Sequence, residues 1–226
     1  MTIFDKNLVQ IIRSNRKKSA LLKVTDNLVQ LVVPLNLSDN RIHEIIKKKS
    51  AWIKKKLIEN LMLPKHKEKE FVSGESFSYL GKNYRLKIIQ STENQVKLKN
   101  RYIQVSVSKG GSVRDLLINW YQNLATKHLC EKTNRYAKII GVCPRSIRVK
   151  EYKSKWGSCS IKGEIAFNWK IIMAPHSVID YLVVHELCHL LEHNHSVRYW
   201  KLLEKTLPNH KEQRAWLKNF GQTLRI

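Results

Sequence analysis

The sequence has little of what marks a secreted or membrane protein. It contains only four cysteines in 226 residues, none of them in a C-x-x-C pair, and their spacing fits no zinc ribbon. No apolar run reaches the length needed to span a membrane, and the first residues have no signal-peptide hydrophobic region. We therefore expect a cytoplasmic protein with reduced thiols, no membrane span and a core that needs no disulfide bonds.

Acidic residues are also scarce. The sequence has 18 of them and 42 lysines and arginines, which gives a net charge of +24. Such an excess favours polyanionic partners. Its densest parts are residues 13–18 and a predicted helix that contains Lys47 to Lys49 and Lys54 to Lys56. Two interpretations stay open, a surface that binds nucleic acid and a solvated basic face. Trp52 is the one aromatic residue there, which argues against a dedicated platform for stacking bases.

The first half of the chain reads as short strands interrupted by one helix. The helix is predicted to begin at Ser38 and to end near Leu63, where Pro64 stops it. The alternation of apolar and polar residues predicts strands at 8–12, 20–24, 28–33, 77–79, 84–89, 95–98 and 102–107. We assign residues 1–110 to a basic α+β accessory region.

The second half has longer helical patterns and a small sheet. Ser112 and Asp115 have the spacing that opens a helix, which is predicted to end near Gly141. Strands are predicted at 146–150 and 164–172, and they are expected to pair around the bend at 156–159. Three more helices are predicted: one capped by Ser177 with Asp180, one through Trp200 and Leu203, and one capped by Asn209 with Glu212. Residues 111–226 are assigned to a second α+β domain.

The most informative motif is His185-Glu186-Leu187-Cys188-His189, which lies within an apolar helical run. Residues four apart share one helix face, so both imidazoles can reach one metal ion. Zinc with three protein ligands keeps a position for water and lowers its pKa, and Glu186 can take the proton. The alternative is an ordinary hydrogen-bonded histidine pair, but buried polar groups in such a helix need a partner that a metal provides.

The third metal ligand is less certain from spacing alone, and His195 is favoured over His193. His193 lies roughly 12 Å beyond His185 along a straight helix, which is too far for one shared ion. His195 can return to the metal if the helix ends first, and Asn194 is expected to end it in the left-handed conformation. Glu192, Glu204 and His210 are less favoured ligands, and Cys188 is expected to pack in the core.

Several further segments carry a resemblance to a known family. They are Lys155-Trp156-Gly157-Ser158-Cys159, 163–169, Ala174-Pro175, 178–181, 194–196 and Tyr199-Trp200, together with 13–17, 51–53, 71–75 and 79–81. With the H-E-x-x-H motif, the chain resembles the YgjP-like metallopeptidases, relatives of the SprT and WLM groups of zincin-fold proteins. A metzincin is disfavoured, because Glu192 occupies the glycine position of that motif and no methionine follows to form a Met-turn.

The resemblance implies a zincin-like fold for residues 111–226 and a protease-like zinc site. His185, His189 and His195 would be the Zn²⁺ ligands, and Glu186 the catalytic acid and base. We expect a zinc-dependent metallopeptidase that acts on peptides or proteins. Two alternatives remain, a metal-dependent hydrolase of nucleotides or other phosphate compounds, and a nucleic-acid-binding protein with a structural metal. The sequence indicates neither the physiological substrate nor the oligomeric state.

Substrate contacts are expected beside the motif. The segment 163–169 is predicted to be an edge strand that binds substrate backbone by strand addition. Trp156 and Trp169 fit either this cleft or the core. Lys155, Ser158 and Tyr199 are three unranked candidates for stabilising an oxyanion.

Overall fold

The structure is a computed structural model that describes residues 9–16, 19–25, 28–62 and 68–226. The chain forms two compact units, Met1–Lys67 and Glu68–Ile226. The second unit therefore begins well before residue 111, although the functional division at residue 110 stays a prediction. The predicted strand start at Leu8, part of the basic segment at Lys17 and Lys18, and the predicted helix end at Leu63 and Pro64 lie outside the described residues.

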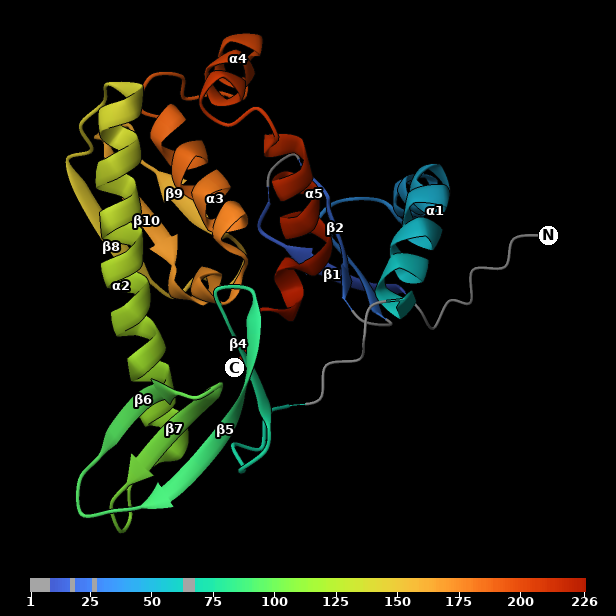
Figure 1. Ribbon diagram of the computed structural model, residues 1–226. Helices are drawn as coiled ribbons and strands as arrows, with labels where there is room; N and C mark the ends of the chain where they lie inside the picture. The colour runs from blue at the N-terminus through green and yellow to red at the C-terminus, as the bar shows by residue number, and fades with distance from the viewer. Residues whose placement is uncertain (1–8, 17–18, 26–27, 63–67) are drawn as a thin grey trace. The chain divides into compact units, whose positions relative to one another are not determined.

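The first unit combines a three-stranded sheet with one helix (Figure 1). Its elements are β1 (Val9–Ser14), β2 (Leu21–Thr25), β3 (Leu28–Pro34) and α1 (Asp39–Met62). The central β3 pairs in parallel with β1 and antiparallel with β2. Alternate residues of β3, Leu31 and Val33, pack with Ile42 of α1 into a small core. The expected strands and helix are thus present close to their predicted bounds.

Arg13 has a structural role in this unit. Its guanidinium donates hydrogen bonds to the main-chain oxygens of Leu35, at 2.8 Å, and Leu37, at 2.7 Å. It also pairs with the Asp39 carboxylate in the first turn of α1, at 2.6 Å. These bonds satisfy carbonyl groups of the connection between β3 and α1. Arg13 is therefore part of the scaffold as well as of the basic segment.

The second unit opens with a four-stranded sheet of order β4-β5-β7-β6. The strands are β4 (Ser76–Tyr79), β5 (Lys82–Gln90), β6 (Gln95–Lys99) and β7 (Tyr102–Val107), which agree with the predicted segments. Pairing is parallel between β5 and β7 and antiparallel elsewhere.

This sheet is fastened to the segment that leads into the H-E-x-x-H helix. The amide of Leu80 donates to the carbonyl of Ile172 at 2.9 Å, and the amide of Gly81 donates to that of Met173 at 3.1 Å. A Cβ on Gly81 would lie only 2.8 Å from the Cα of Pro175, so only glycine permits this approach. The turn between β4 and β5 therefore supports the segment before the H-E-x-x-H helix, and residues 68–110 belong to the same compact unit as that helix.

The long helix α2 (Val113–Ile140) connects the parts of this unit. It begins as predicted, with the Ser112 hydroxyl accepting from the amide of Asp115, and ends at Gly141 in the left-handed conformation, with φ of 81°. Its buried residues are four apart: Leu117, Tyr121, Ala125, Leu129, Thr133 and Ala137. This stripe lets α2 pack against the four-stranded sheet as well as the elements around the motif (Figure 1).

A second, three-stranded sheet has the order β8-β10-β9, which corrects one expectation. Its strands are β8 (Ser146–Lys150), β9 (Gly157–Cys159) and β10 (Glu164–Asn168). The segment expected to be an edge strand is the central strand, because β10 pairs in parallel with β8 and antiparallel with β9. Its backbone groups are used on both sides, and the predicted bend at 156–159 is itself the edge strand β9. After Asn168 the chain forms the 3₁₀ helix η2 (Trp169–Met173).

The remaining elements are α3 (His176–Cys188), α4 (Val197–Thr206), α5 (His210–Phe220) and the 3₁₀ helix η3 (Gly221–Thr223). The predicted capping of two of these helices by side chains is wrong. Pro175 precedes α3 without a side-chain bond, and Asp180 instead forms an ion pair with Lys132 of α2. Asn209 precedes α5, but its main-chain oxygen, not its side chain, accepts from the amide of Glu212.

Most of α3 is buried on all sides, which places it at the centre of this unit. Even so, no helix among the described residues is both long enough and apolar enough to cross a membrane.

The roles of Ser177 and Asp180 can be separated by stability measurements. Asp180→Ala should lower the free energy of unfolding by about 1–3 kcal/mol, because it leaves the mostly buried Lys132 without its partner. Ser177→Ala should change it by less than about 0.5 kcal/mol, since an exposed side chain that does not cap contributes little. Urea unfolding of both variants measures this. A loss of ~1 kcal/mol for Ser177→Ala would instead indicate a cap.

Candidate metal centre

The end of α3 positions two of the three predicted metal ligands. His185 lies in the last turn of α3, and His189 caps its carboxyl end in the right-handed helical conformation. The helix ends earlier than predicted, through turn bonds from Leu190 to the carbonyl of Leu187 and from Leu191 to that of Cys188. Asn194 does not adopt the left-handed conformation that was expected to end the helix. The early end leaves a short loop that brings His195 back to His185.

The three histidines lie around one point. One ring nitrogen of each of His185, His189 and His195 lies within 4.8 Å of the other two. The Nε2 atoms of His185 and His195 are 3.3 Å apart. Two nitrogens that each lie about 2.0–2.1 Å from a tetrahedral zinc ion are about 3.3 Å apart, so this donor set fits zinc. His193 is exposed and does not belong to this group.

Hydrogen bonds to Nδ1 orient two of these imidazoles. Nδ1 of His189 lies 3.1 Å from the main-chain oxygen of Glu192, and Nδ1 of His185 lies 2.6 Å from the hydroxyl of Tyr199. If each Nδ1 carries the proton, it donates to these oxygens and leaves the Nε2 lone pair for a metal. The Tyr199 hydroxyl then donates its own proton to the main-chain oxygen of His185, at 3.0 Å. Both Nδ1 atoms and the Tyr199 hydroxyl thus have hydrogen-bond partners.

Tyr199 was proposed from sequence as an oxyanion candidate, and its contacts give it a different role. Its ring is fully buried, and its hydroxyl is occupied by His185. Tyr199 lies 14 residues from His185 and on another helix, so no local pattern indicates the contact. Its hydroxyl fixes the orientation of a predicted ligand rather than facing a substrate.

Burial favours the neutral forms of His185 and His195. Loss of solvent lowers the pKa of His185 to about 3, and the neighbouring His189 and His195 contribute to the shift. The pKa of His195 is also lowered, first by burial and then by His189 and Arg214. Neutral imidazole is the form that binds a metal ion, so the cluster is prepared for a cation at physiological pH.

Glu186 lies beside the cluster and packs directly on β9. Its side chain is buried with 4% exposure, and burial raises its pKa to about 8, against an opposing effect of Lys155. A Cβ added to Gly157 would lie 2.3 Å from Oε1 of Glu186, far closer than non-bonded atoms approach. Gly157 therefore makes room for the carboxyl group, which gives a physical reason for the Trp156-Gly157 pair in the sequence.

The strand beside Glu186 has a free edge. Of the described strands, β9 pairs only with β10, and it contacts α3. Ser158 of β9 shares a hydrogen bond of 2.7 Å with the hydroxyl of Tyr152, so its hydroxyl is already engaged. The edge that could pair with a substrate is therefore β9, not the segment 163–169.

The two tryptophans and the cysteine considered in the sequence lie in different environments. Trp169 is buried with 1% exposure, and Cys188 is buried in a cluster with Tyr181, Val184, Tyr199 and Leu203. Trp156 is only partly buried and lies against Gly221, with 3.0 Å between its Nε1 and the position of a Cβ there. Trp169 and Cys188 are thus core residues, whereas Trp156 lines a pocket. All four cysteines are free thiols.

Comparisons with known proteins place this geometry in a family context. The family described as "YgjP-like, metallopeptidase domain" matches residues 18–220. The crystal structure of the metallopeptidase zymogen abylysin from Pyrococcus abyssi is 24% identical over 40% of this chain and 93% of that chain, with a TM-score of 0.37. The zymogen jannalysin from Methanocaldococcus jannaschii is 19% identical over 42% and 96%, with a TM-score of 0.37. No curated protein matches the sequence.

The choice between His195 and His193 can be tested by zinc binding. His195→Ala should lower the affinity for Zn²⁺ more than about 100-fold, because even substitutions behind a ligand cost 10–100-fold. His193→Ala is the matched control and should leave the affinity unchanged, since His193 is exposed and outside the cluster. Competition with a chromophoric chelator measures both variants. Equal affinities for the two variants would exclude His195 as a ligand.

Proposed function

The chain belongs to the YgjP-like metallopeptidase family and is a metal-dependent hydrolase, and we propose that it cleaves peptide bonds with one Zn²⁺ ion held by His185, His189 and His195. Glu186 is proposed as the general base. The observation that carries this proposal is the convergence of three imidazoles beside a buried carboxyl group. The family favours peptides over the nucleotide substrates considered from the sequence.

The donor set suits zinc, because imidazole nitrogen is a preferred zinc ligand and three protein ligands are typical of catalytic sites. When bound, the ion supplies Lewis acidity, which polarises a carbonyl group and lowers the pKa of water toward 7. His185 and His189 are held in the binding orientation by Tyr199 and by the carbonyl of Glu192. Such outer contacts keep the ligands in place without adjusting during the reaction.

Glu186 is suited to move a proton between the two halves of the reaction. Its buried carboxyl group has a pKa of about 8, so it can both accept and release a proton near neutral pH, and a neighbouring cation would lower that pKa. We propose that it accepts a proton from the attacking water and then donates that proton to the nitrogen of the departing amine. The contact with Gly157 holds the carboxyl group in one position.

The substrate backbone is proposed to bind along β9. Its free edge lies beside the helix that carries Glu186, and an extended peptide could add to it as a strand. A zincin-like arrangement of residues 111–226 remains part of the proposal. It is supported by α3, by the sheet that contains β9, and by the return of the chain at His195.

Glu186→Gln tests the proposed chemistry. It should lower kcat/KM for a quenched peptide substrate by about 10²–10⁴-fold, because the amide cannot accept the proton. Zinc content should be unchanged, since Glu186 is not a proposed ligand. Glu212→Gln makes the same change at an exposed position in α5 and should retain full activity. Activity that survives Glu186→Gln would show that the reaction belongs to another site.

Gly157→Ala tests the packing beneath Glu186. The added methyl group should displace the carboxyl group and reduce kcat/KM by about 100-fold or more, because a shift of about 1 Å has effects of that size. Zinc binding should be retained.

Gly110→Ala is the matched control for the same substitution. It meets no atom within 4 Å, and its positive φ should cost only about 1 kcal/mol of stability without loss of activity. Equal activity of the two variants would refute the packing role of Gly157.

A further inference from the structure

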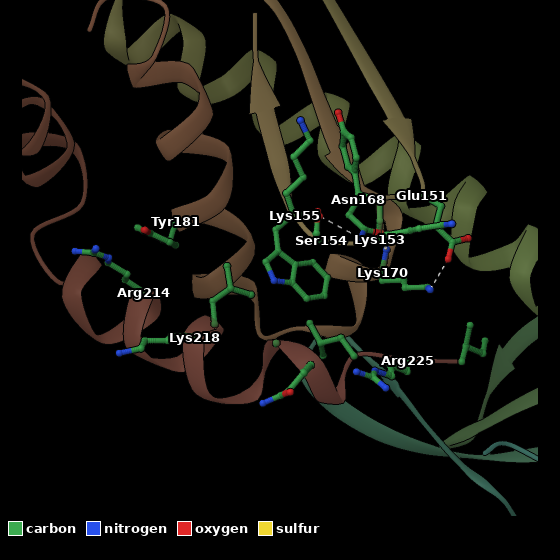
Figure 2. Close-up of a pocket in the computed structure, with 17 residues that line it drawn as sticks. Glu151, Lys153, Ser154, Lys155, Asn168, Lys170, Tyr181, Arg214, Lys218 and Arg225 are labelled. Carbon is green, nitrogen blue, oxygen red and sulfur yellow. Dashed lines mark hydrogen bonds and ion pairs between the residues drawn. The ribbon is translucent and has the colours of Figure 1, made fainter. Parts of the chain in front are cut away.

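A large basic pocket lies next to the candidate metal centre. It has a volume of about 820 Å³ and is formed by the segment before β9, by η2, by α5 and by the last residues of the chain. Figure 2 shows basic side chains from all of these segments around it. The cationic residues of its lining are Lys153, Lys155, Lys170, Arg214, Lys218 and Arg225. The lining contains one acidic side chain, Glu151.

Most of these positive charges are not neutralised by the protein. Glu151 forms an ion pair with Lys170, with 2.6 Å between Oε1 and Nζ. No acidic side chain in the described ranges forms an ion pair with any of the other five cationic residues. Like charges around one cavity repel one another, and an anionic ligand relieves that repulsion. Among the side chains of the lining, positive charges therefore outnumber negative ones by five.

The pocket and the metal centre share walls. Tyr181 lines the pocket, and its ring centroid is 5.6 Å from that of His185, one turn further along α3. Trp156 also lines the pocket and immediately precedes Gly157, on which Glu186 packs. The pocket therefore adjoins the residues that pack against His185 and Glu186.

Arg214 packs on Trp200, which in turn packs on His195 of the candidate metal centre. Its guanidinium lies 4.6 Å from the ring centroid of Trp200, and Trp200 stacks on His195 with 5.5 Å between centroids. A planar guanidinium fixed in this way can bind a carboxylate with two parallel hydrogen bonds.

We propose that this pocket selects peptide substrates with acidic side chains next to the bond that is cleaved. The inference rests on the proposed peptidase function. Glutamate or aspartate side chains would enter the pocket and contact Arg214 and the neighbouring lysines, while the adjacent peptide bond lies between Glu186 and the histidine cluster. Arg214 and Lys218 are thus residues that determine specificity.

A nucleic-acid strand fits the pocket less well. Binding of unpaired bases relies on exposed aromatic faces. The ring of Tyr152 is already covered by the ammonium groups of Lys150 and Lys155, at 4.9 and 4.7 Å from its centroid. Trp156 packs on Gly221. The remaining recognition is therefore electrostatic, which suits carboxylate groups.

The test compares quenched peptides that differ only in the residues beside the cleaved bond, which are glutamate, glutamine or lysine. The zinc-loaded protein should cleave the glutamate peptide with a kcat/KM about tenfold above that of the glutamine peptide, and rising salt should reduce this ratio. Lys218→Glu should abolish the ratio and improve cleavage of the lysine peptide. Lys109→Glu makes the same change in charge in an exposed turn outside the pocket and should leave the preference intact.

Peptide binding separates a failure of this inference from a failure of the proposed function. Anisotropy of labelled peptides on zinc-loaded Glu186→Gln protein reports the pocket without turnover. Preferential binding of the glutamate peptide, lost in Lys218→Glu, supports the pocket even if no peptide is cleaved. Equal binding of the glutamate and glutamine peptides overturns the inference even if both are cleaved. Displacement of the glutamate peptide by a short single-stranded oligonucleotide of higher affinity also overturns it and assigns the pocket to nucleic acid.

Discussion

The burial of α3 is the constraint on which the catalytic unit depends. This helix is surrounded by apolar side chains, yet its carboxyl end carries His185 and Glu186 and is capped by His189. Removal of solvent lowers the pKa of His185 and raises that of Glu186, so the uncharged forms dominate without a metal. A cation held by the histidines would favour the ionised form of the Glu186 carboxyl group. The same burial that makes the helix part of the core thus suits its polar end to a metal ion.

The polar groups of the helix are supported by elements distant in sequence. Tyr199 from α4 orients His185, and Gly157 from β9 makes room for Glu186. On the opposite side, the amides of Leu80 and Gly81 hold the chain just before α3, and Lys132 pairs with Asp180 within it. The sheet of residues 76–107 is consequently part of the framework of the site. A basic pocket adjoins the same framework, and we propose that it selects the substrates that reach the metal site.

Local patterns in the sequence predicted most elements and the histidine cluster. The H-E-x-x-H spacing identifies one helix face, and alternation along 95–98 or 102–107 identifies strands, because both depend on residues close in the chain. The order of strands was wrong for 163–169, since pairing partners depend on distant segments. For the same reason Asp180 was assigned to a cap although Lys132 binds it. The contact of Tyr199 with His185 and the convergence of Arg214 and Lys155 on one pocket also required the structure.

The central claim is that the three histidines form an open metal site with Glu186 free beside it. Its most direct test is anomalous diffraction at the zinc edge from crystals of the zinc-loaded protein. We expect one strong peak within bonding distance of Nε2 of His185, His189 and His195, with the fourth position open to solvent and Glu186 outside the ligand set. A peak bonded to Glu186, or one centred on His193 or Glu192, would contradict it.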